Sequence, residues 1–153
     1  MDDRALLRTL RTQFTLDWDG IHGIRHWERV RENGLRLAAL TGAKPLVVEL
    51  FALFHDSRRE NDGHDPHHGA RAADFARTLL APMLDASDLE LLAVACRDHS
   101  KGFTEGDVTV TTCWDSDRLD LGRVWTKPKP SRLCTAAARD PELIEWAYAR
   151  SLR

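Results

Sequence analysis

The sequence predicts an all-α protein with the layout of a compact helical bundle. Apolar residues recur at helical spacing in one segment after another, and proline, glycine and polar clusters separate these segments. Every segment with a clear periodic pattern is helical, and no repeat, low-complexity tract or interdomain linker interrupts the series. At 153 residues the chain has the length of one domain. We therefore expect a single domain of about six to eight helices over residues 1–153.

Composition excludes several classes of protein. Apolar content of 42% and charged content of 30% are ordinary for a globular chain, and a formal net charge of −2 gives no basic field for nucleic acid. No apolar run approaches the roughly 18–20 residues of a membrane span, and the N-terminal segment is charged from its second residue and lacks the apolar stretch that is typical of a signal peptide. Cys96, Cys113 and Cys134 form no CxxC pair, which favours reduced, packed thiols. We expect a cytoplasmic protein without membrane or nucleic-acid partners, and a homo-oligomer is compatible with the sequence.

The first two segments have clear apolar faces. Leucines and a phenylalanine at helical spacing predict a helix over 2–14. After a glycine-containing turn, a second amphipathic pattern runs from about residue 24 and ends at Gly42, just before Pro45. This pattern places His26 in the first turn of the second helix, where a side chain can point toward the end of a neighbouring helix.

Residues 46–60 dominate the sequence. Leu46–Phe54 is apolar apart from Glu49, which predicts a buried helix that opens at Pro45 and runs directly into His55 and Asp56. A buried carboxylate without a partner is heavily penalised. A metal ion is one partner that would satisfy this pair, and a neighbouring arginine is another.

Two further helices also end or begin with histidine. Asp65 before Pro66 predicts an N-cap, and the small residues of His68-Gly69-Ala70 and the next turn would allow a neighbouring helix to approach closely. Residues 85–99 form another apolar-faced helix, in which Ser87 and Glu90 resemble a capping box and His99 stands at the end. The segment 111–124 follows a loop, and 131–138 and 141–152 are expected to be short C-terminal helices that pack on the rest.

The polar residues at these helix ends form one candidate metal site. They are His26, His55, Asp56, His68, His99 and Asp117. Imidazoles with carboxylates and no thiolate suit iron or manganese best, and zinc, magnesium, cobalt or nickel are compatible. Two choices stay open: His64 and His67 compete with His68, and Asp115 and Asp120 compete with Asp117.

The order His26, His55-Asp56, Asp117 resembles the H…HD…D signature of the HD superfamily of metal-dependent phosphohydrolases, an all-helical fold. The resemblance covers residues 20–125 and places the final aspartate near the beginning of a helix. His68-Gly69-Ala70-Arg71-Ala72 is similar to the HG-x-x-A element of the branches that bind two metals, and His99 to their second added histidine. The resemblance implies one ion at His26, His55, Asp56 and Asp117, and a second at His68 and His99 with Asp56 bridging.

The resemblance implies hydrolysis of a phosphate ester or anhydride by metal-activated water. The pattern looks most like the dinucleoside-polyphosphate hydrolase and cyclic-dinucleotide phosphodiesterase branches, so a nucleotide is the expected substrate. It departs from both, because no lysine follows the HD pair and there is no GYP motif. Arginine suits bidentate phosphate contact, and the basic residues next to the expected ligands are Arg58, Arg59, Lys101 and Arg118.

Several roles have plain alternatives. Asp56, Arg59 and Glu60 are the candidate catalytic residues, with Asp65 as another outer acid or base. Arg58 and Arg59 could instead lie on a solvated face or pair with Glu60 and Asp62. The five tryptophans suit core packing more than stacking on a base. For the whole protein, a metal-dependent sensor without turnover and an HD-type di-iron oxygenase are the alternative functions.

Overall fold

The computed structural model describes residues 1–153 and contains seven α-helices, two 3₁₀-helices and no strand. The α-helices are α1 (Asp3–Gln13), α2 (Ile24–Thr41), α3 (Pro45–Phe54), α4 (His68–Leu80), α5 (Ala86–Asp98), α6 (Val108–Arg118) and α7 (Pro141–Ser151). The 3₁₀-helices are η1 (Leu121–Val124) and η2 (Pro130–Arg132). The predicted all-α bundle of six to eight helices is confirmed.

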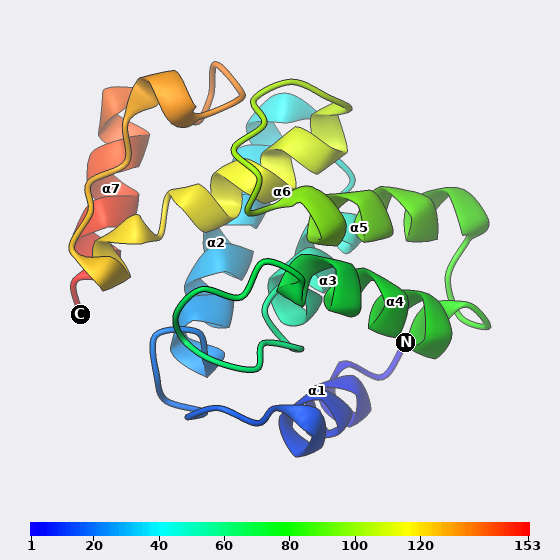
Figure 1. Ribbon diagram of the computed structural model, residues 1–153. Coiled ribbons are helices and arrows are strands. Elements are labelled where there is room, and N and C mark those ends of the chain that lie inside the picture. The colour runs from blue at the N-terminus through cyan, green and yellow to red at the C-terminus, as the bar shows by residue number, and fades with distance from the viewer.

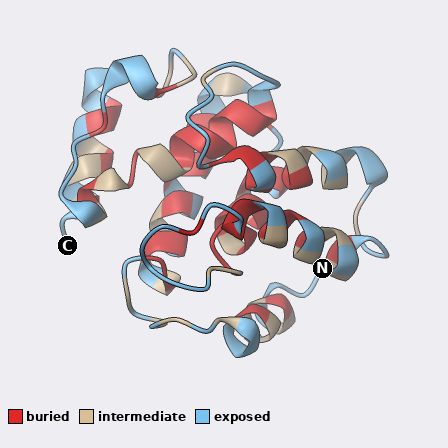
Figure 2. Cartoon of the chain, in the orientation of Figure 1, coloured by how far each residue is buried: buried red, intermediate tan, exposed pale blue.

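The helices α2, α3, α5 and α6 make up the centre of the molecule (Figure 1). Helix α4 packs along α5, α1 packs against α3, and α7 packs on η1 and α2 at the other end. The buried residues lie where the helices face one another (Figure 2). This arrangement directs the ends of five helices toward one interior region.

Two hydrophobic clusters support the arrangement. The larger cluster contains Phe51 and Phe54 of α3, and each of the helices α1 to α6 contributes apolar side chains to it. In the smaller cluster, Leu37 of α2 and Leu119 pack with Leu133 and with apolar side chains of α7. Because the C-terminal part of the chain has its own apolar contacts, it packs firmly beside the end of α6.

Glycine allows the closest approach between helices. A Cβ atom on Gly69 would lie 2.4 Å from the carbonyl oxygen of Cys96, so α4 and α5 touch through their backbones beside His68 and His99. Gly34 serves the same purpose between α2 and α3, where a Cβ atom would lie 2.3 Å from Val48 Cγ1. The predicted close approach at the small residues of α4 is therefore confirmed.

One predicted helix start and one predicted capping box are wrong. Helix α4 begins at His68, not Pro66, because both carboxylate oxygens of Asp65 bind Arg71 at 2.7 Å and one also accepts the Glu60 N–H. The carboxylate is therefore not available as a cap. In α5 the N-cap is Asp85, and the Ser87 hydroxyl donates to the Asp85 carboxylate instead of forming the expected capping box.

Two features of the C-terminal part also differ. Helix α6 starts at Val108, so Asp117 lies in its last turn and not near its beginning. The segment 131–138 is not an α-helix: η2 covers only Pro130–Arg132, and turns follow. The carboxylate of Asp115 accepts hydrogen bonds from the backbone N–H groups of Cys134 and Thr135, at 2.7 and 2.9 Å. In a helix over 131–138 these N–H groups would instead have bonded to carbonyl oxygens of the preceding turn.

None of the helices has the length and apolar character that crossing a membrane requires. All three cysteines are free, with Cys96 and Cys113 buried.

Candidate metal centre

The structure brings all six candidate ligands together at helix ends. His26 lies in the first turn of α2, and His55 and Asp56 follow the last residue of α3. His68 opens α4, His99 follows the last residue of α5, and Asp117 lies in the last turn of α6. Five of the six are buried, and Asp117 is nearly so. The side chains form two adjacent groups of three.

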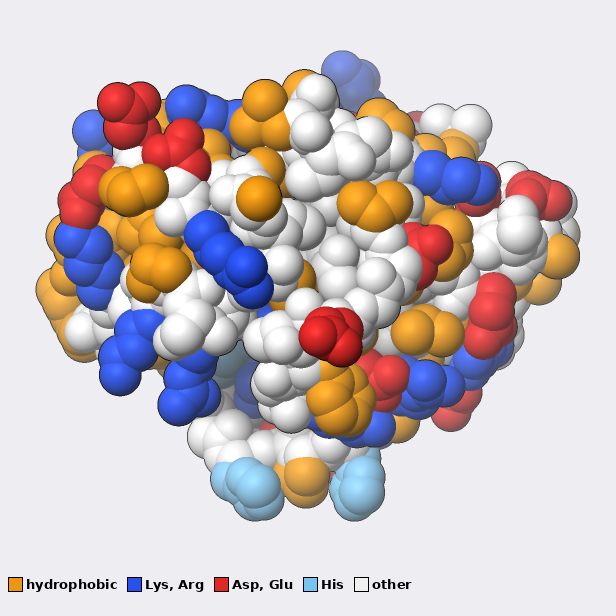
Figure 3. Space-filling view, turned by 90° about the horizontal axis from the view of Figure 1, so that it is seen from above, with side chains coloured by type: hydrophobic (Ala, Val, Ile, Leu, Met, Phe, Trp, Pro, Cys, Tyr) orange, Lys and Arg blue, Asp and Glu red, His pale blue; other side chains and the backbone are white.

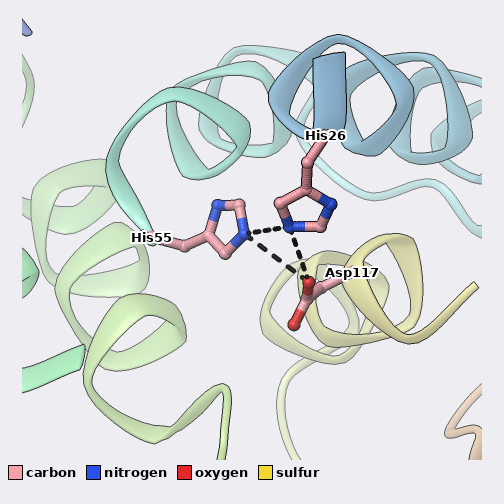
Figure 4. A group of neighbouring side chains, drawn as sticks. All are labelled: His26, His55 and Asp117. Atoms are coloured by element: carbon pink, nitrogen blue, oxygen red, sulfur yellow. Dashed lines mark hydrogen bonds and ion pairs between the residues drawn. The ribbon is translucent and has the colours of Figure 1, made fainter. Parts of the chain in front are cut away.

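The first group consists of His26, His55 and Asp117 (Figure 4). The Nε2 atoms of the two imidazoles are 3.0 Å apart. Asp117 Oδ1 lies 3.2 Å from Nε2 of His26 and 3.5 Å from Nε2 of His55. All three donor atoms therefore point at one small volume.

The second group consists of Asp56, His68 and His99. The Nε2 atoms of His68 and His99 are 2.9 Å apart, and Asp56 Oδ1 lies 3.3 and 3.5 Å from them. The other oxygen of the same carboxylate, Oδ2, lies 3.3 Å from Nε2 of both His26 and His55. Asp56 thus faces both groups, as a bridging ligand would.

The Nδ1 atoms of three rings, those of His55, His68 and His99, face backbone carbonyl oxygens that fix the orientation of the ring. Nδ1 of His55 is 3.1 Å from the carbonyl oxygen of Phe51, and Nδ1 of His68 and His99 lie 2.5 and 2.6 Å from carbonyl oxygens in their own turns. A carbonyl can only accept, so in each ring Nδ1 carries the proton and donates. In the neutral rings, Nε2 is then left with a lone pair, which is the form that binds metal.

These contacts fit a cation. Two Nε2 lone pairs at about 3 Å repel each other unless a positive charge lies between or beside them. Asp117 Oδ1 is buried and accepts no hydrogen bond within the protein, an arrangement that is costly without a partner. A divalent ion at each group would satisfy the facing imidazoles and the unpaired carboxylate oxygen together.

The pKa values of the ligands show the same need for positive charge. Burial by itself lowers the pKa of His55, but the Asp56 and Asp117 carboxylates outweigh it and raise the pKa to about 10. Burial likewise opposes ionisation of Asp56, yet the histidines around it hold its pKa well below the usual range. The carboxylates thus stay ionised, and in the absence of metal the His55 imidazole keeps a proton.

Asp120 is part of the site in a role that sequence reasoning missed. Its Oδ2 accepts a hydrogen bond from His26 Nδ1 at 2.6 Å, and its Oδ1 accepts one from Arg29 at 2.7 Å. Carboxylates that hold the distal nitrogen of a ligating histidine fix the ring and raise its basicity. Arg123 was also missed: it donates to the carbonyl of Asp120, and its Nη2 lies 3.9 Å from Asp117 Oδ1.

A cavity of about 760 Å³ opens beside the two groups. Asp56, His99 and Asp117 form part of its wall. Six basic side chains also line it: Arg59, Arg118, Arg123, Lys127, Lys129 and Arg132. Asp56 and Asp117 are the only acidic residues in the lining, so basic side chains outnumber carboxylates in the cavity wall.

Arg59 lines the cavity beside Asp56. Its Nε donates to Asp56 Oδ1 at 3.2 Å, and its Nη1 donates to the carbonyls of Asn61 and Gly63. These bonds hold the guanidinium at the edge of the metal ligands. Arg118 also lines the cavity, at the end of α6.

Other predicted site residues lie away from the cavity. Arg58 donates to Gln13 and covers the ring of Phe75, and Glu60 is exposed near Arg71. Lys101 pairs with Asp98 at 2.8 Å and does not line the cavity, although its neighbours Ser100 and Gly102 do.

Among the competing candidate ligands, His64 and His67 are exposed. Asp115 is buried, but its carboxylate accepts hydrogen bonds from the backbone N–H groups of Cys134 and Thr135. His68 and Asp117 are the members of their sets that the fold brings to the centre.

The helical bundle thus brings the H…HD…D set and two further histidines together in two groups that could each hold a metal ion. A scan of the chain against protein-family models gives no match, and neither does a search of curated proteins. Among solved structures, the crystal structure of a predicted HD superfamily hydrolase from an uncultured Thermotogales bacterium superposes with a TM-score of 0.75. The two sequences are 28% identical, and the similarity covers 98% of this chain and 87% of the other.

The resemblance to the HD superfamily is thereby confirmed. The shared fold and the two ligand groups support a general metal-dependent hydrolase.

Proposed function

We propose that the protein is a metal-dependent phosphohydrolase that cleaves a phosphate ester or anhydride in a small molecule, with nucleotides as the first class to test. The observation that carries this proposal is the position of the Asp56-bridged ligand groups in the wall of a cavity lined by six basic side chains. Positive charge and positioning are what phosphoryl transfer chiefly requires. Iron and manganese suit the four imidazoles and two carboxylates best.

The residues of the site have different roles, which follow from their positions. Divalent ions held by the two groups supply Lewis acidity and lower the pKa of water toward neutrality. Asp56 fixes the distance between the groups because each of its oxygens faces one of them. Arg59 presents a guanidinium beside Asp56, where it can bind a phosphoryl oxygen and balance the charge that develops there.

Replacement of Asp56 tests the proposal. Protein purified without chelator is analysed for metal and then assayed, with added manganese or ferrous iron, against nucleotides, sugar phosphates and a generic phosphate ester. We expect wild type to carry close to two metal equivalents and to release phosphate, and Asp56→Ala to lose both the metal and the activity. Asp74→Ala removes an exposed carboxylate that belongs neither to the ligand groups nor to the cavity wall, and it is the matched control.

The same panel distinguishes the alternative functions. Full metal content in Asp56→Ala would place the metal elsewhere and overturn the assignment. Tight metal-dependent binding of a phosphorylated ligand without any turnover would assign a sensor. Oxygen consumption by the reduced di-iron protein would assign an oxygenase.

A further inference from the structure

One wall of the cavity comes from a chain segment outside the metal ligands. Residues 126–133 follow η1 and contribute Lys127, Lys129 and Arg132 to the lining. Lys127 is paired with Glu145 of α7. Lys129 and Arg132 are exposed and make no ion pair with a carboxylate, so their charges are free to act on a ligand in the cavity.

Arg118 adds a third cation beside this segment. Its Nη1 donates to the carbonyl of Arg132 at 3.0 Å and to the sulfur of Cys134. Its Nη2 is buried and has no acceptor within the protein. An unsatisfied charged donor in a cavity wall is costly, and it adds to the positive field that the wall presents.

The backbone that carries Lys129 and Arg132 is fixed. Pro128 is buried and Pro130 opens η2, so the prolines restrict the chain on both sides of Lys129. Leu133 is buried in the smaller hydrophobic cluster, and Asp115 holds the residues that follow it. The two cations are therefore presented from a rigid support rather than a mobile loop, which lowers the entropic cost of binding.

The size and chemistry of the cavity show what this wall can bind. About 760 Å³ is in the range of whole small-molecule sites and exceeds the volume of one phosphate group. No aromatic side chain lines it, and its hydrophobic lining consists of Leu121 and Leu133. Lys and Arg side chains gather around a hollow on the left of Figure 3. The cavity offers charge along its length and no surface on which a base could stack.

We infer that Lys129 and Arg132, with Arg118 beside them, form a second anion subsite, and that the substrate carries at least two phosphate groups. One phosphate lies at the metal ligands and Arg59, and another lies at this subsite. The inference rests on the proposed phosphohydrolase function, and it makes charge, not the identity of a base, the basis of substrate selection.

The test compares ligands with one and with several phosphates. The double variant Lys129→Met/Arg132→Met removes both free cations from the subsite. Lys44→Met/Arg77→Met makes the same change in net charge at positions outside the cavity and is the control. Binding of inorganic tripolyphosphate and of orthophosphate is measured by calorimetry on the metal-loaded proteins, and kcat/KM is measured for a nucleoside triphosphate series and for a generic phosphate monoester.

We expect the subsite variant to weaken tripolyphosphate binding at least tenfold and orthophosphate binding less than threefold. Its kcat/KM should fall at least tenfold more for triphosphates than for the monoester, and wild type should accept different bases within a few-fold of one another. Equal losses for both ligand classes, or equal losses in the control variant, would overturn the subsite and leave the hydrolase standing. Selective loss of tripolyphosphate binding in a protein without turnover would overturn the hydrolase and retain the subsite.

Discussion

Asp56 faces both ligand groups because each of its two carboxylate oxygens lies close to a different pair of histidines. Oδ2 is directed at His26 and His55, and Oδ1 is directed at His68 and His99. The residue stands one position after His55, directly beyond the end of α3. The adjacent His-Asp pair thus serves both groups from a single helix end, which is the physical reason for the two residues to be consecutive.

Asp120 positions His26 from the other side of the ring. Replacement by asparagine keeps the size of the side chain but removes the negative charge that Nδ1 donates to at 2.6 Å. Partners of this kind are worth about 10–100-fold in metal affinity, so we expect Asp120→Asn to weaken metal binding by about that factor. Competition with a chromophoric chelator measures the affinity.

Asp74→Asn, in an exposed pair with Arg77, is the matched control for that experiment. Metal affinity within twofold of wild type in Asp120→Asn would show that the carboxylate has no influence on the ligand. A fall in the melting temperature without a change in affinity would reduce Asp120 to a structural role.

The ligands could be predicted from the sequence because each one stands at or near one end of a predicted helix and because their order resembles the H…HD…D signature. The role of Asp120 could not. It is three residues from Asp117, and the sequence gives no means to distinguish a carboxylate that faces Nε2 of His26 from one that faces Nδ1 of the same ring. Only the three-dimensional positions of the two carboxylates relative to the His26 ring decide between the two.

At the scale of elements, the contact between α4 and α5 sets the distance between His68 and His99. A Cβ atom on Gly69 would lie 2.4 Å from one backbone carbonyl oxygen and 2.8 Å from the next. Neither atom can move without moving α5. The glycine after His68 is thus required by the packing of two helices as much as by the site itself.

Gly69→Ala should push α4 away from α5 and separate the two histidines. We expect a loss of about 1–3 kcal/mol in stability, as overpacked cores show, and a metal content that falls from close to two equivalents toward one. Thermal unfolding and elemental analysis measure the two effects. Gly63→Ala, where the nearest atom would be 3.4 Å away, is the control, and wild-type metal content in Gly69→Ala would contradict the argument.

Asp115 connects α6 to the segment that forms the basic wall. Its carboxylate accepts the N–H groups of Cys134 and Thr135 and the hydroxyl of Thr135. Asp115→Asn would turn an amide N–H toward one of these donors. We expect a loss of about 1–3 kcal/mol and a raised KM for multiply phosphorylated substrates, with unchanged metal content. A variant that lost metal instead would place Asp115 among the ligands.

The same contact explains why a helix predicted over 131–138 is absent. The local composition of Thr135 to Ala138 favours a helix, but a carboxylate from a distant part of the chain binds two of the N–H groups involved. The helices with long apolar patterns, α2 and α3, were predictable because their own sequences decide them. The C-terminal segment depends on a partner that no local pattern reveals.

At the scale of the whole molecule, the net charge of the chain does not reveal the excess of basic side chains in the cavity. The chain carries a net charge of −2, yet six basic residues meet in one cavity. Five of them lie between residues 118 and 132, a stretch with more basic than acidic residues. This local excess of basic residues is visible in the sequence, and it favours a small anionic ligand even though the net charge of the chain is slightly negative.

Metal binding should stabilise the whole fold, since five helix ends meet at the two ligand groups. A free metal concentration about 100 times Kd contributes about 2.7 kcal/mol, which for a chain of this size corresponds to roughly 5–10 °C in melting temperature. We expect chelation to lower the melting temperature by this amount and re-addition of manganese or iron to restore it. An unchanged melting temperature would show that the folded protein does not bind the ion.

The stabilisation by metal should also grow with pH. The pKa of His55 in the metal-free protein is raised to about 10, above its value of about 6.5 in an unfolded chain. The protonated imidazole therefore stabilises the chelated protein fully below about pH 6.5, and that contribution is lost as pH rises toward 10. Metal displaces the same proton, so its affinity increases over the same interval. Melting temperatures of loaded and chelated protein at pH 6, 8 and 9.5 should diverge steadily, and a constant difference would mean that His55 binds no metal.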